Sequence, residues 1–198
     1  MKIIFASHNA GKIRELRALL SRFNIEIIPQ AELGISEADE TGLTFVENAL
    51  LKARHAAAHT GLPAIADDSG LEVFALHGKP GIHSARYAED PKKNIEKLLF
   101  QLQAMPDEKR AARFYCALTY LAYPEDPTPL ICQGAWEGSI LKAPQGKDGF
   151  GYDPIFYVSS EKCSAAELSL DKKNQLSHRG QALQILVEKL FEKMEHPL

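Results

Sequence analysis

The first 28 residues switch from one hydrophobic pattern to another, and this switch limits the folds that are open to the chain. Residues 2–6 hold three large apolar residues in succession, which predicts a short buried strand. Residues 25–28 predict a second strand. Between them, apolar residues recur every three to four positions, which predicts a helix with one buried face: Ile13, Leu16, Leu19, Leu20 and Phe23. Strand, polar turn, helix and strand in this order are typical of an α/β fold.

The middle of the chain continues the alternation of helices and strands. Thr44, with Glu47 three residues later, predicts a capping box that opens a helix, and Gly61 is a plausible end for it. Residues 63–66 predict a buried strand, and residues 71–74 predict another strand after a tight turn at Ser69 and Gly70. The predicted elements therefore surround a short acidic segment, Asp67-Asp68.

The second half adds a helix over residues 94–102 and an antiparallel hairpin of residues 113–123 and 130–140, joined by a turn-rich segment. A final helix is predicted after Ser177. Its inward face is formed by apolar residues at helical spacing: Leu183, Leu186, Val187, Leu190 and Phe191. We expect one domain over residues 1–198, with two lobes and a cleft between them.

Composition excludes several classes of protein. The chain is 45% hydrophobic and 25% charged, as in an average globular domain. A net charge of −3 argues against a protein that coats nucleic acid or an anionic membrane. Three cysteines without a CxxC pair favour a reducing compartment and offer no structural zinc site. With no signal-peptide pattern in residues 1–7, we expect a cytoplasmic protein without nucleic-acid or membrane partners.

SHNAGK, residues 7–12, stands where the first strand meets the first helix. The N–H groups at a helix N-terminus bind phosphate well, and Lys12 can add a full positive charge. The segment is not a P-loop, because that motif would need Gly in place of Ala6 and Ser or Thr in place of Ile13. It is therefore either a phosphate site or a solvated helix cap.

ADDSG places two carboxylates after an apolar strand. Burying unpaired charge is costly, so Asp67 and Asp68 must face water, a cation or a metal. Because consecutive side chains of a strand point to opposite faces, the two need not share one site. The acidic pair Asp39-Glu40 can bring further oxygen ligands, which favour Mg²⁺ over zinc. A solvated turn is the alternative.

Two later segments can contact a nucleotide. In GFGYDP, the ring of Phe150 or Tyr152 can stack on a base, and Asp153 can accept hydrogen bonds. In SHRG, His178 and Arg179 can donate to carbonyl or phosphate oxygens. Each segment has an ordinary structural reading as well, as a packed aromatic turn or a helix cap.

Taken together, SHNAGK, ETGLTFVENA, ADDSGLEV, PGIHSARYA, GFGYDPIF and SHRGQAL resemble the inosine/xanthosine triphosphate pyrophosphatases, which are dITP/XTP pyrophosphatases. The resemblance runs in order from residue 3 to about residue 190. It implies an elongated mixed β-sheet with flanking helices and a homodimer. It also implies Mg²⁺-dependent hydrolysis of ITP, dITP and XTP to the monophosphate and pyrophosphate, with Mn²⁺ as a possible substitute for Mg²⁺.

The resemblance also assigns roles to residues. Asp68 would be the general base and a metal ligand, with Asp39, Glu40 and Asp67 as further metal ligands. The substrate would contact the residues of the matching motifs: Ser7, His8, Asn9, Ala10, Gly11, Lys12, Ser69, Phe150, Gly151, Tyr152, Asp153, Lys173, His178 and Arg179. Lys173 and Arg179 would read the base carbonyl. The family has Thr-Gly-Asn where this chain has Ser7-His8-Asn9, and a non-glycine residue is costly there if φ is positive.

Two other classes remain open from the sequence. A nucleotide-binding module without hydrolysis would keep SHNAGK and SHRG but would not need Asp68. A dimeric aspartic protease would use Asp68-Ser69-Gly70 from each subunit, because such enzymes need two aspartates that share a proton. Turnover of ITP with and without Mg²⁺ separates these readings.

Overall fold

The computed structural model describes residues 1–20, 23 and 25–195. Its strands are β1 (Lys2–Phe5), β2 (Glu26–Pro29), β3 (Ala64–Val73), β4 (Ala111–Leu121), β5 (Leu130–Ile140), β6 (Phe156–Val158) and β7 (Cys163–Ser164). Its α-helices are α1 (Ala10–Leu20), α2 (Phe45–Thr60), α3 (Pro91–Gln101), α4 (Leu170–Leu176) and α5 (His178–Glu195). Strands and helices therefore alternate as far as β4, and β4 and β5 are the two strands of the predicted hairpin.

The strands form one seven-stranded sheet in the order β2-β1-β3-β4-β5-β6-β7. Strand β1 pairs parallel with β2 and with β3, while β6 pairs antiparallel with β5 and with β7. The helix α1 supplies the crossover that a parallel β1–β2 pair needs. The prediction of a mixed sheet with flanking helices is confirmed.

The chain divides into two compact units. Unit 1 consists of Met1–Asp68, Cys116–Gly134 and Arg179–Leu198, and unit 2 consists of Ser69–Tyr115 and Ala135–His178. The boundaries fall inside β3, β4 and β5 and between the first two residues of α5. Each unit has a hydrophobic core of its own.

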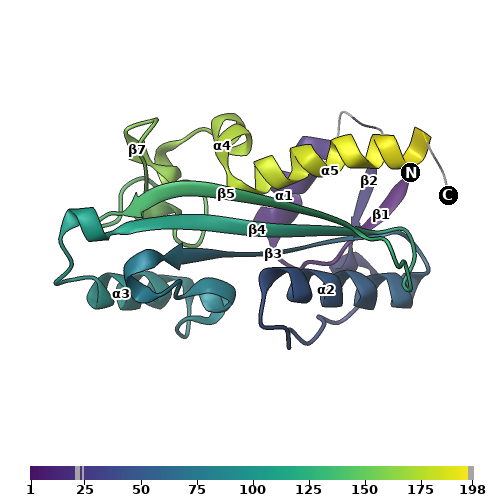
Figure 1. Ribbon diagram of the computed structural model, residues 1–198, viewed down its shortest axis with the longest axis horizontal. Coiled ribbons are helices and arrows are strands. Elements are labelled where there is room, and N and C mark those ends of the chain that lie inside the picture. Colours follow the sequence, from purple (N-terminus) through teal and green to yellow (C-terminus); the bar gives the residue numbers. More distant parts are fainter. Residues whose placement is uncertain (21–22, 24, 196–198) are drawn as a thin grey trace. The chain divides into compact units, whose positions relative to one another are not determined.

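In unit 1, β1 is buried on both faces, which explains its uninterrupted apolar run. Ile3 and Phe5 pack in a cluster with residues of α1 and α5, whereas Ile4 and Ala6 pack against the alanines of α2. Figure 1 shows α1 and α5 on one side of these strands and α2 on the other. This part of the sheet is therefore covered by helices on both faces.

In unit 2, the core is centred on aromatic side chains. Phe114 packs with its ring centroid 4.5 Å from that of Phe156 and 6.4 Å from that of Trp136. Leu98 and Leu102, at the end of α3, are fully buried in the same cluster. This core carries the GFGYDP segment, because Tyr152 belongs to it.

The capping box predicted for α2 is present. Thr44 Oγ1 accepts a hydrogen bond from the Glu47 N–H at 3.2 Å, and Glu47 Oε2 accepts one from the Thr44 N–H at 2.8 Å. The helix ends at Gly61 with φ of 66°, which is the left-handed geometry that glycine adopts at low cost. Both helix boundaries were therefore encoded locally.

The predicted strand–turn–strand at residues 63–74 is wrong. Strand β3 runs without a break through Asp67, Asp68, Ser69 and Gly70. The acidic pair does not interrupt it, because both carboxylates have cationic partners. Gly70 is needed for close packing, since a Cβ there would lie 2.2 Å from the carbonyl oxygen of Gly81.

Three helix details also differ from the sequence prediction. Helix α1 ends at Leu20, so Phe23 lies beyond it, although its side chain packs against the same core cluster. A short additional helix, α4, ends at Leu176, and only Ser177 separates it from α5. On α5, Phe191 was predicted to face inward but is 42% exposed, with its ring against that of Phe23.

In the described part of the chain, no helix has the length and apolar content to cross a membrane.

Candidate active site

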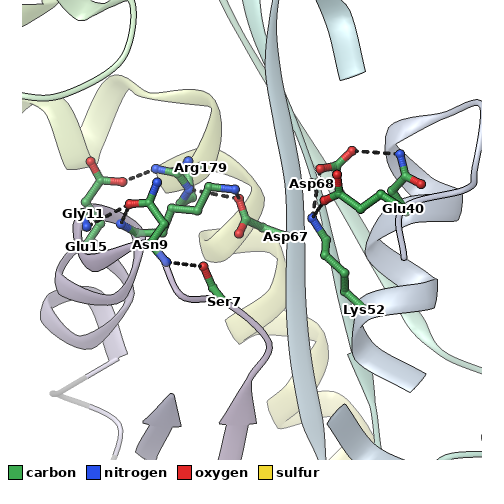
Figure 2. Close-up of polar contacts among 11 residues, drawn as sticks. Ser7, Asn9, Gly11, Glu15, Glu40, Lys52, Asp67, Asp68 and Arg179 are labelled. Carbon is green, nitrogen blue, oxygen red and sulfur yellow. Dashed lines mark hydrogen bonds and ion pairs between the residues drawn. The ribbon is translucent and has the colours of Figure 1, made fainter. Parts of the chain in front are cut away.

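Two adjacent carboxylates at the middle of β3 organise the candidate site. Asp67 is 1% exposed and Asp68 is 6% exposed. Figure 2 shows their side chains on opposite sides of the strand, as the alternation of a β-strand requires. Each carboxylate therefore has its own set of partners in unit 1.

On the first side, Asp67 lies between two cations. Asp67 Oδ2 is 2.8 Å from Lys12 Nζ and 3.4 Å from Arg179 Nε. Arg179 also donates from its Nη1 to Glu15 of α1. Burial by itself raises the pKa of Asp67, but Lys12 and Arg179 outweigh it and hold this pKa well below the usual range. Asp67 therefore stays charged at neutral pH.

The start of α1 lies on the same side (Figure 2). Asn9 Oδ1 accepts hydrogen bonds from the N–H groups of Gly11, at 2.9 Å, and Lys12, at 3.1 Å. Ser7 Oγ accepts one from the Asn9 N–H at 3.2 Å. The segment Ser7–Lys12 therefore forms a capped helix N-terminus, which fits both readings of the sequence, and Lys12 reaches Asp67.

His8 fits this turn without backbone strain. Among the described residues, only His77 and Lys162 are non-glycine residues with positive φ, so the possible cost of a side chain at position 8 does not arise. His8 Nδ1 lies 3.2 Å from Gln30 Nε2 and 3.1 Å from Glu37 Oε1. The imidazole of His8 thus contacts two polar side chains from outside the segment Ser7–Lys12.

On the second side, Asp68 faces helix α2. Lys52 Nζ lies 2.9 Å from Asp68 Oδ1 and 2.8 Å from Glu40 Oε1, so one ammonium group bridges two carboxylates. Asn48 Nδ2 is 3.4 Å from Asp68 Oδ2. Burial raises the pKa of Asp68, and the nearby Lys52 offsets only part of that rise. Asp68 therefore holds its proton more readily than Asp67 does.

Of the four predicted metal ligands, the structure brings together Glu40 and Asp68. Asp67 points to the other side of β3, and Asp39 is exposed, with its carbonyl oxygen bonded to the Thr41 N–H. Over the residues that the structure describes, no group of three or more His, Cys, Asp or Glu side chains could hold a metal ion. Two carboxylates that converge on one ammonium group do fit Mg²⁺, which proteins bind through one or two carboxylates while substrate phosphates and water complete the shell.

A second cluster lies in unit 2 and includes GFGYDP. Lys173 Nζ is 2.7 Å from Asp153 Oδ2 and 4.6 Å from the centre of the Phe150 ring. The same carboxylate oxygen accepts the Phe150 N–H at 2.8 Å, and Tyr152 donates its hydroxyl to the Ser84 carbonyl at 3.0 Å. Gly151, between these residues, has φ of 60°, where a side chain would be strained. A flat ring and a buried ammonium group are therefore held side by side.

The residues of SHRG are divided between the two units. The imidazole of His178 stacks on Phe114 in unit 2, with centroids 4.9 Å apart and planes 12° apart. The guanidinium of the next residue, Arg179, belongs to the Asp67 cluster of unit 1. The resemblance assigns Lys173, His178 and Arg179 to the base carbonyl and the phosphates, with Lys173 and Arg179 reading the carbonyl. In the structure Lys173 contacts Asp153, whereas Arg179 contacts Asp67 and Glu15.

The segments that resemble the pyrophosphatases therefore form two defined polar clusters, and comparison with known proteins decides the family. The sequence model that defines the Ham1 family matches residues 3–189. This chain belongs to the Ham1 family. The "dITP/XTP pyrophosphatase" of Shigella flexneri is 59% identical over 192 residues, which cover 96% of this chain and 98% of that protein.

Solved structures of Ham1 proteins have the same fold. The structure of a HAM1 protein from Coxiella burnetii has a TM-score of 0.89 and 50% identity, and it covers 97% of this chain and 99% of that one. The Staphylococcus aureus Ham1 protein has a TM-score of 0.85 and 40% identity, with 98% and 100% covered. The resemblance noted in the sequence is confirmed.

Three residues of this Ham1 site were not found from the sequence: Glu15, Asn48 and Lys52. A weak signal was present, because each is a polar residue next to buried apolar residues of a helix. Glu15 precedes the buried Leu16 in α1, and Asn48 and Lys52 are one turn apart among the buried alanines of α2. A charged residue on a buried face requires a partner, but the sequence does not show which one.

Proposed function

We propose that this protein hydrolyses deaminated purine nucleoside triphosphates, namely ITP, dITP and XTP, to the monophosphate and pyrophosphate. By doing so it would keep inosine and xanthine out of DNA and RNA. The observation that carries the proposal is the pair of buried carboxylates on β3, with Lys12 on one side and the Glu40–Lys52 pair on the other. The pyrophosphatase names of the Ham1 relatives support the same activity.

The phosphates would be held at the start of α1. A helix N-terminus carries partial positive charge, and Lys12 adds a full charge beside it. The Lys12 side chain is 17% exposed, and its ammonium group is paired with Asp67. Such a group attracts every triphosphate, whatever its base.

Glu40 and Asp68 are the residues that would hold Mg²⁺. When bound, this ion neutralises charge on the phosphates and on the pyrophosphate that leaves. Mn²⁺ could substitute for Mg²⁺, because both ions prefer oxygen ligands. Lys52 would have to release one or both carboxylates, since its ammonium group occupies the position between them.

Asp68 would serve as general base. It would orient a water molecule for in-line attack between the α- and β-phosphates and accept its proton. Burial raises the pKa of Asp68, which brings its affinity for a proton closer to neutral pH than that of an exposed aspartate. This environment suits a carboxylate that must take up a proton during the reaction.

The base would be recognised by the cluster in unit 2. Inosine and xanthine have a carbonyl at C6, where adenine has an amine. Lys173 can only donate hydrogen bonds, so it would favour the carbonyl and disfavour the amine. The Phe150 ring offers a flat surface for stacking, and Asp153 holds the ammonium group of Lys173 in place.

A protease function finds less support. Aspartic proteases need a second carboxylate that shares a proton with the first. Asp68 instead has Lys52 and Asn48 as its partners within the described part of unit 1. A module that binds nucleotides without hydrolysis would have no need for a buried carboxylate of raised pKa.

The deciding experiment is an assay with ITP, with ATP as the control nucleotide. We expect release of pyrophosphate rather than orthophosphate from ITP in the presence of Mg²⁺, and little release from ATP. Removal of divalent ions with EDTA should abolish turnover, and added Mg²⁺ should restore it. Binding of ITP without release of pyrophosphate would favour a module that binds nucleotides without hydrolysis. Full turnover in EDTA would show that the reaction needs no divalent metal ion.

We also propose that the protein is a homodimer in the cytoplasm, as the family resemblance implies. Size-exclusion chromatography with light scattering measures the mass directly. A mass of about one chain at micromolar concentration would contradict the dimer.

A further inference from the structure

One motif of the family resemblance has no assigned role: PGIHSARYA, residues 80–88. None of its residues is among the predicted substrate or metal contacts. Most of it forms the short 3₁₀ helix Gly81–Arg86 of unit 2, in which Ser84 is the buried residue and is 7% exposed. A buried polar side chain costs free energy unless it has hydrogen-bond partners. The partners of Ser84 therefore show what this motif does.

The side chain of Ser84 joins this short helix to β3. Ser84 Oγ accepts a hydrogen bond from the Leu71 N–H at 2.8 Å and donates one to the Gly81 carbonyl at 2.6 Å. The two segments lie so close that a Cβ on Gly70 would be 2.7 Å from Ser84 Oγ. Leu71 comes two residues after Ser69, which is a predicted substrate contact. Ser84 therefore fixes β3 directly beside Ser69.

The main-chain carbonyl of Ser84 holds the GFGYDP segment. It accepts a hydrogen bond from the hydroxyl of Tyr152 at 3.0 Å. Burial raises the pKa of Tyr152, so this hydroxyl keeps the proton that it donates. Next to Tyr152 in sequence is Asp153, whose carboxylate binds both the Phe150 N–H and Lys173 Nζ. One carbonyl group thus supports the turn that carries the predicted base contacts.

Ser84 is itself fixed by α3. Asn94 of this helix is 4% exposed, and its Nδ2 lies 3.4 Å from the Ser84 carbonyl oxygen and 3.3 Å from that of Ala85. Asn94 Oδ1 accepts a hydrogen bond from the Ala88 N–H. The helix is anchored in the aromatic core of unit 2 by Leu98. The Ser84 carbonyl therefore has a fixed position, and it keeps one donor when the Tyr152 hydroxyl is removed.

We propose that Ser84 is a positioning residue for base recognition, which holds the GFGYDP segment at a fixed place relative to Ser69 within unit 2. It acts on Phe150 and Lys173 through Tyr152 and does not need to contact the substrate. This proposal rests on the proposed function, because that function assigns the base to Phe150 and Lys173. The competing explanation is that Ser84 contributes only to the stability of unit 2.

The two products of the reaction separate these explanations, because IMP carries the base and pyrophosphate does not. Their affinities can be measured by isothermal titration calorimetry with Mg²⁺ present, without any need for turnover. Tyr152→Phe keeps the packed ring and removes the hydroxyl that is bonded to Ser84. We expect it to weaken IMP binding by about three- to tenfold, the effect of one lost hydrogen bond, and to leave pyrophosphate binding within about twofold.

Two further variants reach the same support from the β3 side and leave Tyr152 intact. Ser84→Ala removes both side-chain hydrogen bonds, and Gly70→Ala forces Ser84 and Gly81 away from β3. Each should weaken IMP binding at least as much as Tyr152→Phe does. If all three act on one support, Ser84→Ala combined with Tyr152→Phe should bind IMP within about twofold of Ser84→Ala alone.

The matched control is Tyr87→Phe. It removes a tyrosine hydroxyl from the same motif, but this hydroxyl bonds Gln101 of α3, so we expect IMP binding to be unchanged. Urea unfolding of every variant reports any loss of stability. Steady-state kinetics with ITP give a second readout: in Tyr152→Phe, KM should rise while kcat stays within about twofold.

The outcomes are distinguishable. Unchanged IMP affinity in Tyr152→Phe and Ser84→Ala, even with a lower unfolding midpoint, would make Ser84 a purely structural residue and overturn the proposal. Equal losses of IMP and pyrophosphate affinity would overturn it as well, because they indicate general damage. Should Ser84→Ala fail to fold, Tyr152→Phe alone decides.

The proposed function is tested separately by the wild-type protein. If it binds IMP but does not hydrolyse ITP, the proposed function fails, and the IMP affinities of the variants still test the role of Ser84. If it does not bind IMP at all, there is no base recognition for Ser84 to support, and the positioning role is overturned directly.

Discussion

The two sides of β3 in unit 1 place the same chemical group in two different environments. Asp67 and Asp68 are adjacent aspartates, both buried, and each contacts a lysine at 2.8 to 2.9 Å. Yet the pKa of Asp67 is lowered and the pKa of Asp68 is raised. Burial acts on both in the same direction, so the difference must come from the neighbouring charges.

Those charges differ in sign and number. Asp67 has Lys12 and Arg179 beside it, and both stabilise its ionised form. Asp68 has Lys52, but Glu40 shares that ammonium group and repels the Asp68 carboxylate. A carboxylate with two cationic partners stays ionised and stabilises the fold. A carboxylate that shares its one cation with a second carboxylate can more easily bind a proton or a metal ion. The comparison therefore predicts opposite effects for the same substitution at two neighbouring positions.

The largest effect is expected on turnover. Asp68→Asn keeps the shape of the side chain but loses the base and a metal ligand, so kcat for ITP should fall by about 10²–10⁴-fold or more. The free energy of unfolding should not fall, because the change removes a buried carboxylate of raised pKa while Glu40 still pairs with Lys52. Steady-state kinetics and urea unfolding measure the two quantities. A folded variant with near-normal turnover would remove Asp68 from the mechanism.

The next effect is on stability. Asp67→Asn removes the shared counter-ion of the buried Arg179 and the partly buried Lys12, and breaking a buried pair in this way costs about 3–5 kcal/mol. The midpoint of urea unfolding should shift accordingly at pH 7. If the Asp67→Asn protein were as stable as wild type, the ion pairs of Asp67 would not contribute to the free energy of unfolding. Asp67 and Asp68 would then not differ in their effect on stability.

The smallest effect is the pH dependence of the difference in unfolding free energy between each variant and the wild-type protein. Since the folded-state pKa of Asp67 is depressed, its contribution is complete above its unfolded value of about 3.9 and is lost as pH falls through the folded value. The deficit of Asp67→Asn relative to wild type should therefore shrink below about pH 4.

Asp68 should show the opposite sign. With a raised folded-state pKa, its contribution to stability is present below about pH 3.9 and is lost as pH rises through the folded value. Asp68→Asn should match wild type in acid and equal or exceed it at pH 7. Urea unfolding of the three proteins from pH 3 to pH 7 tests both signs, and parallel curves for the two variants would contradict the assigned pKa directions.

Local signals allowed much of the fold to be predicted from the sequence. The capping box at Thr44 and the apolar face of α1 depend on residues only a few positions apart. The continuity of β3 could not be predicted, because an acidic pair inside a strand is stable only with partners from distant elements. Lys12 and Arg179 reach Asp67 from α1 and α5, and no local pattern announces that contact.

The candidate site follows the same rule. Motifs pointed to Asp68, Lys12 and Lys173, since each belongs to a recognisable segment. Glu15 was missed because its partner Arg179 is 164 residues away. Charge on a buried helix face shows that a partner must exist, and only the tertiary structure identifies it.

The continuity of β3 has a consequence for how the strand is assembled. A shift of one residue in its pairing with β1 would turn every β3 side chain to the opposite face. Asp67 would then meet the lysine that already has an acidic partner, and Asp68 would be placed against Lys12 and Arg179. Over Ala64 to Ala66, hydrophobic contacts would hardly oppose this shift, because these residues are buried on both faces, whereas further along the strand it would remove Leu71 and Val73 from the core. The acidic pair would also oppose the shift, because both carboxylates would lose their native partners, so the residues proposed for catalysis favour the native strand alignment as well.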